Sequence, residues 1–120
     1  MIDIMTKILI GMVAAMHLYF CYFEIFKWES AGPKLLNSRD KDFFKNTKAM
    51  MANQGLYNLF LAAGLIWSLL SKNHTMSFYL AIFFLSCVVI AGIFGSFTVS
   101  RRIFYIQALP ALIALILLHF

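Results

Sequence analysis

The chain has 120 residues, of which 62% are hydrophobic and only 12% are charged. A soluble domain usually carries about twice that charged fraction, so the composition argues against a soluble globular protein and for a membrane protein. The formal net charge is +5, yet no basic face interleaved with aromatic residues exists outside the apolar runs, which excludes nucleic-acid binding. A chain of this length allows one domain, residues 1–120.

Four apolar stretches follow one another along the chain, at residues 8–26, 49–70, 78–99 and 103–120. Each is close to the roughly 20 residues that a helix needs to cross the hydrocarbon core of a bilayer. Backbone polar groups must be paired within each element there, so we expect an all-α, integral membrane four-helix bundle. The first stretch is expected to be retained, because Tyr19 and Phe20 do not suit a signal-peptide cleavage site.

The basic residues are distributed unevenly between the connecting segments. Eight lie between the first two or the last two stretches: Lys27, Lys34, Arg39, Lys41, Lys45, Lys48, Arg101 and Arg102. Only Lys7 and Lys72 fall on the opposite side. The positive-inside rule therefore predicts that both basic segments are cytoplasmic and both termini extracytoplasmic, in the inner membrane of a bacterial cell.

The first basic segment, residues 27–48, is expected to contain a short amphipathic surface helix. Residues 31–33, Ala-Gly-Pro, predict a turn before it. Ser38 is the expected N-cap of a helix starting at Arg39, and Phe43 and Phe44 would rest in the membrane interface while lysines reach lipid headgroups.

Polar side chains within the apolar stretches are costly and therefore informative. His17 and Glu24 lie seven residues apart on one face of the first stretch. Asn53, Gln54, Tyr57 and Asn58 form an arc at the start of the second. Near the cytoplasmic side, Thr98 lies close to the end of the third stretch, Arg101 follows that stretch, and Gln107 lies near the start of the fourth.

The predicted topology places these side chains at similar depth, in the cytoplasmic third of the bundle. We therefore expect a shared polar pocket, with ligand-binding residues His17, Glu24, Asn53, Gln54, Tyr57, Asn58, Thr98, Arg101 and Gln107. Two simpler interpretations remain open. The amides can act only as interhelical contacts, and Glu24 can pair with Lys27, Arg101 or Arg102. No second histidine matches the depth of His17, so we expect no metal site, and the sequence indicates no particular cofactor.

Several segments resemble a known family. They are residues 53–58 (NQGLYN), 60–65 (FLAAGL), 91–95 (AGIFG), 98–102 (TVSRR) and 107–111 (QALPA). Together with His17 and Glu24, they resemble the bacterial membrane-protein family catalogued as domain of unknown function 1304. The resemblance implies a four-helix bacterial membrane protein and carries no established activity.

Three classes of function stay open. The favoured one is binding or transport of a lipid or a small amphipathic ligand by the polar pocket. The second is a membrane enzyme acting on a lipophilic substrate, with Glu24 or His17 as acid/base and Tyr57 as hydrogen-bond donor. The third is a structural or accessory subunit, and four short helices make a homo-oligomer credible.

Overall fold

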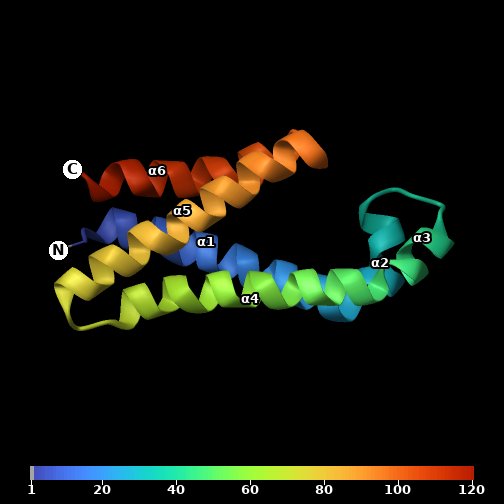
Figure 1. Cartoon of the computed structure of the whole chain (residues 1–120), viewed down its shortest axis with the longest axis horizontal. Helices are drawn as coiled ribbons and strands as arrows, with labels where there is room; N and C mark the ends of the chain where they lie inside the picture. Colours follow the sequence, from blue (N-terminus) through green and yellow to red (C-terminus); the bar gives the residue numbers. More distant parts are fainter. Residues whose placement is uncertain (1) are drawn as a thin grey trace. The chain divides into compact units, whose positions relative to one another are not determined.

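The computed structural model describes residues 2–120, and in this part of the chain the secondary structure consists of helices without a strand (Figure 1). This confirms the all-α prediction. The α-helices are α1 (Ile4–Tyr22), α2 (Trp28–Leu35), α3 (Lys41–Asn46), α4 (Lys48–Leu70), α5 (His74–Thr98) and α6 (Leu109–Leu118). Two π-helical turns, η1 (Phe23–Lys27) and η2 (Phe104–Ala108), join α1 to α2 and lead into α6.

Two helical runs are long and apolar enough to cross a membrane: Ile4–Leu35 and His74–Thr98. Phe104–Leu118 is apolar but shorter, and α4 is not among the candidates although it has 23 residues. The first half of α4 carries Asn53, Gln54 and Asn58, which lower its mean hydropathy. Length and composition thus support two of the four predicted spans.

The first helical run extends beyond its predicted end at residue 26, and the turn predicted at residues 31–33 is wrong. Pro33 lies inside α2, and the chain leaves the helix at Asn37, which adopts a left-handed conformation with φ 51°. Ser38 N–H donates to the carbonyl of Pro33 at 2.8 Å, and Asn37 N–H donates to that of Lys34 at 3.3 Å. This is a Schellman C-cap, for which Asn is a usual substitute for Gly.

The short helix predicted in the segment 27–48 is present as α3, but it starts later and has a different cap. Asp40 is its N-cap and accepts a hydrogen bond from Phe43 N–H at 3.1 Å, whereas Ser38 accepts one from Asp40 N–H. The carboxylate of Asp40 is better placed than Ser38 because it faces the free N–H groups of the first turn.

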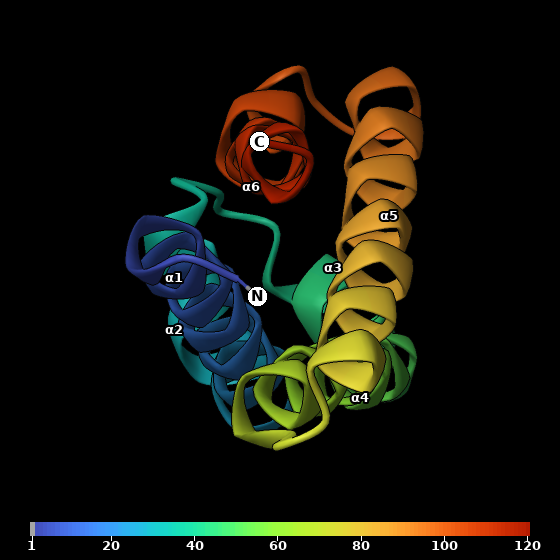
Figure 2. The same cartoon turned by 90° about the vertical axis from the view of Figure 1, so that its left-hand side faces the viewer.

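The chain divides into two compact units, which are described separately. The first comprises the described residues up to Ala15 together with Leu61–Phe120. Its core is formed by small and branched apolar side chains, among them Ile10, Leu65, Leu85 and Ala111. Within this unit α5 and α6 lie side by side (Figures 1 and 2). The turn between α4 and α5 is closed by a reciprocal pair, in which each hydroxyl of Ser68 and Ser77 donates to the other residue's carbonyl at 2.9 and 2.6 Å.

The second unit, Met16–Phe60, contains η1, α2 and α3. Phe44 from α3 is 1% exposed and packs against Gly32 and the ring of Trp28, 4.9 Å away between centroids. The indole N–H of Trp28 donates to the Thr47 hydroxyl at 2.9 Å. The prediction that Phe44 rests in the membrane interface is therefore wrong, because α3 turns this ring inward, while Phe43 is exposed as expected.

Candidate functional site

A hydrogen bond within the second unit joins two of the predicted site residues. The side-chain amide of Asn58 donates to Oε1 of Glu24 at 2.6 Å. Asn58 is buried and Glu24 is half-buried. Since Lys27 forms no ion pair with Glu24 in the described residues, the interpretation that these two side chains pair is wrong for this structure.

Gly55 allows this contact by letting α4 approach the first helical run closely. A Cβ at Gly55 would lie 2.9 Å from Cγ1 of Ile25 and 3.1 Å from the carbonyl oxygen of Cys21. Gly55 and Asn58 are three residues apart and share one face of α4. That face therefore combines close packing at Gly55 with the hydrogen bond between Asn58 and Glu24.

The neighbouring polar residues of α4 point elsewhere. Asn53, Gln54 and Tyr57 are all exposed. Because each residue turns an α-helix by about 100°, they leave the face that carries Gly55 and Asn58. Of the four polar residues predicted on this helix, the structure brings only Asn58 to Glu24.

His17 is fully buried in α1, and its ring packs edge-on against Phe20 with centroids 5.5 Å apart. The residue also takes part in a further interaction.

The remaining predicted site residues lie in the first unit. The hydroxyl of Thr98 donates to the carbonyl of Phe94 at 2.9 Å, within its own helix. Arg101 is exposed, and Gln107 is half-buried in η2 with an interaction partner. In residues 2–120 no three His, Cys, Asp or Glu side chains are grouped as a metal would require.

Sequence reasoning missed an open groove of about 390 Å³ on the second unit. Its lining residues are Tyr19, Tyr22, Phe23, Lys27, Ala31, Lys34 and Leu35. All come from one continuous helical run that contains η1. In the sequence the groove is indicated by the aromatic residues within 19–23 followed by Lys27 and Lys34. These side chains share one face of the helical run only because of the π turn η1.

The charges around the groove are predominantly positive. Glu29, the acidic residue between its two lysines, forms an ion pair with Lys48 at 3.4 Å. In the described part of the chain Lys27 and Lys34 form no ion pair. The groove therefore combines an aromatic and aliphatic floor with two uncompensated ammonium groups.

Comparison with known proteins yields a family and no function. No curated protein and no solved structure matches this chain. The family model described as protein of unknown function (DUF1304) matches residues 11–119, which include η1, the Glu24–Asn58 contact and the groove. The chain therefore belongs to the DUF1304 family, as the resemblance of residues 53–58 and the other matching segments predicts.

Proposed function

We propose that this chain is a four-span protein of the bacterial inner membrane that binds an anionic amphipathic molecule in the groove between Tyr19 and Leu35. The observation that carries the proposal is the presence of two unpaired lysines among aromatic side chains in that groove. The proposed orientation has both termini outside the cell and the segment 27–48 in the cytoplasm.

Membrane insertion is supported by the apolar side chains that the protein leaves uncovered. In α5, Phe83, Ile90, Phe94 and Phe97 are exposed, the last by 85%. Only 22% of the most apolar window of this helix is buried. A soluble monomer rarely exposes an apolar surface of this extent, whereas lipid tails would cover it without cost.

The chemistry of the groove favours a ligand with both an anionic head and an apolar tail. Lysine ammonium groups attract phosphate or carboxylate, and aromatic rings at a membrane interface contact acyl chains. Lys27 and Lys34 also extend long apolar stems that can cover the tail of such a ligand. A phospholipid with a net negative headgroup has both properties.

The π turn explains why one helical run can form this groove. The lining includes every fourth residue of the run: Tyr19, Phe23, Lys27, Ala31 and Leu35. In a regular α-helix residues four apart are offset by about 40°, so the stripe would drift by about 160° from end to end. The extra residue of η1 takes back about 100° of this drift and keeps the side chains on one face.

The Glu24–Asn58 hydrogen bond supports the groove indirectly. Glu24 lies in η1 between Phe23 and Lys27, both of which line the groove. By holding η1 against α4, the bond fixes the rotation of the residues on either side. None of the other residues predicted to bind a ligand lines the groove, and their role stays a prediction from the sequence: Asn53, Gln54, Tyr57, Thr98, Arg101 and Gln107.

Lipid selectivity of the purified protein tests the binding proposal. Native mass spectrometry from a neutral detergent compares bound phosphatidylglycerol with phosphatidylcholine of the same chain length. We expect the double variant Lys27→Gln/Lys34→Gln to lose the preference for the anionic lipid. The matched control Lys41→Gln/Lys45→Gln removes the same charge from exposed positions of α3 and should keep it. Equal losses in both variants would refute a specific site.

Cysteine labelling tests the proposed orientation. In a background without Cys21 and Cys87, a cysteine at exposed Ser30 should react with a membrane-impermeant maleimide only in inverted vesicles. A cysteine at Lys72 should react only in intact spheroplasts. The opposite pattern would rule out the proposed topology.

The Glu24–Asn58 contact also favours a second candidate, a structural or accessory subunit in which this bond only locks the helices together. In that case Glu24→Gln changes stability or oligomeric state, and no lipid preference exists in the wild-type protein. The lipid experiment thus separates the two candidates directly.

A further inference from the structure

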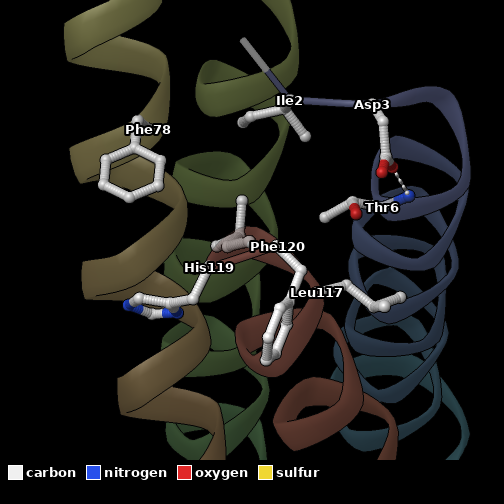
Figure 3. A pocket seen from close by; sticks show the side chains of 8 residues that line it. Ile2, Asp3, Thr6, Phe78, Leu117, His119 and Phe120 are labelled. Atoms are coloured by element: carbon white, nitrogen blue, oxygen red, sulfur yellow. Dashed lines mark hydrogen bonds between the residues drawn. The ribbon is translucent and has the colours of Figure 1, made fainter.

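A second pocket lies in the first unit and shares no lining residue with the proposed lipid groove (Figure 3). Its walls come from the start of α1, from α5 and from the end of α6, and its volume is about 220 Å³. The lining residues are Ile2, Asp3, Thr6, Phe78, Leu117, Leu118, His119 and Phe120. None of them belongs to the polar set predicted from the sequence.

Thr6 provides a polar group that is buried without a partner. The residue is 1% exposed, and its hydroxyl makes no hydrogen bond with any residue in the range 2–120. Figure 3 shows the side chain directed from α1 toward the pocket. A buried hydroxyl without a partner is unfavourable, so a molecule in the pocket that hydrogen-bonds it gains affinity.

Asp3 supplies a negative charge beside that hydroxyl. Its Oδ1 accepts a hydrogen bond from the backbone N–H of Thr6 at 2.8 Å. This backbone hydrogen bond holds the pKa of the Asp3 carboxyl below its usual value, so the group is ionised at neutral pH. The Thr6 hydroxyl makes no hydrogen bond to the carboxylate and stays available to a ligand.

His119 adds a polar ring to the lining of the same pocket. Its Nδ1 lies 2.8 Å from the carbonyl oxygen of Leu115. A carbonyl only accepts, so Nδ1 donates this hydrogen bond. Among the described residues no lysine or arginine lines the pocket.

The remaining walls favour a cation with an apolar body. Phe78 presents an aromatic ring, which is 6.3 Å from the His119 ring between centroids, and Ile2 and Leu118 add aliphatic surface. The C-terminal end of α6, where backbone carbonyls concentrate negative potential, also borders the pocket. The opposing positive end of α1 is already capped by Asp3.

We propose that this pocket binds a small organic ammonium ion, with the ammonium group between the Asp3 carboxylate and the Thr6 hydroxyl and its apolar body against Phe78 and Leu118. The size is suitable, because a cavity of about 150 Å³ is enough for benzene.

Two probes of equal size test the proposal on the full chain in neutral detergent. Phenethylamine carries an ammonium group where 2-phenylethanol carries a hydroxyl. We expect isothermal titration to show at least tenfold tighter binding of the amine by the wild-type protein. Asp3→Asn, which keeps a residue able to cap α1, should reduce this preference to about one.

Two further variants complete the test. Thr6→Val should weaken binding of the amine severalfold, because it removes the hydroxyl while keeping the shape of the side chain. Asp42→Asn removes an exposed carboxylate in α3 and should leave both affinities unchanged. Absence of binding, equal affinity for the two probes, or a preference that persists in Asp3→Asn would each overturn the proposal.

Discussion

Asn58 and Glu24, 34 residues apart in the chain, are joined by a 2.6 Å hydrogen bond from the Asn58 amide to the Glu24 carboxyl group. The bond links α4 to the π turn η1, whose extra residue sets the rotation of everything that follows it in the first helical run. This contact therefore influences both the packing of the second unit and the face on which the groove forms.

Asn58→Ala tests how much this bond contributes. The half-buried carboxyl group of Glu24 would lose its donor, so we expect the free energy of unfolding to fall by about 1–3 kcal/mol. Denaturant titration in detergent measures the change. Asn53→Ala, at an exposed amide of the same helix, should cost less than about 0.5 kcal/mol. Similar losses in both variants would contradict a specific role for Asn58.

Gly55→Ala tests the close approach of α4 to the first helical run. The new Cβ would lie 2.9 Å from the side chain of Ile25 and 3.2 Å from Cβ of Glu24, so the helices must separate. We expect a loss of about 1–3 kcal/mol in the free energy of unfolding. Gly11→Ala is the control, because its Cβ would meet only Leu69 at 3.9 Å. That variant should gain up to about 1 kcal/mol from higher helix propensity.

Phe44→Ala tests whether this ring packs inside the protein or in lipid. Removing a buried ring that contacts Gly32 and Trp28 should cost about 3–5 kcal/mol and change the fluorescence of Trp28. Phe43→Ala, at the exposed neighbouring position, should cost about 1 kcal/mol or less. If Phe43 proves the more costly loss, α3 presents its other face to the protein.

Asp3 makes stability depend on pH in a defined direction. Its pKa in the folded protein lies below the usual 3.8, because the hydrogen bond from the Thr6 N–H stabilises the ionised form. A lowered folded-state pKa contributes stability above the unfolded value, and this contribution is lost as the pH falls through the folded value. The difference in Tm between wild type and Asp3→Asn should therefore be present at neutral pH and should close below 3.8. A difference that widens in acid would contradict this assignment.

Thr6→Val tests the unpartnered hydroxyl in the absence of ligand. Replacing it by a methyl group removes a buried polar atom, so we expect the free energy of unfolding to rise by about 1–2 kcal/mol. Thr75→Val, at an exposed position near the start of α5, should be close to neutral. A destabilised Thr6→Val variant would indicate that the hydroxyl has a partner in the free protein.

Several local features were readable from the sequence because their causes are local. The apolar runs 49–70 and 78–99 closely match α4 and α5, since backbone hydrogen bonds of a helix form within the segment itself. The end of α2 was also encoded locally, by Asn37 followed by Ser38, but the prediction assigned the turn to Pro33 instead. Pro33 does not end α2, and the helix continues to the cap that Asn37 and Ser38 provide.

The sequence by itself determined that the chain is helical, apolar and rich in polar residues at the start of its second long helix. Only the tertiary structure decided that Asn58, and not Asn53 or Gln54, meets Glu24. The physical reason is rotation about the helix axis. One extra residue in η1 turns the following side chains by about 100°. Such a π turn forms where tertiary packing favours it, so the hydrophobic periodicity of the sequence does not predict its position.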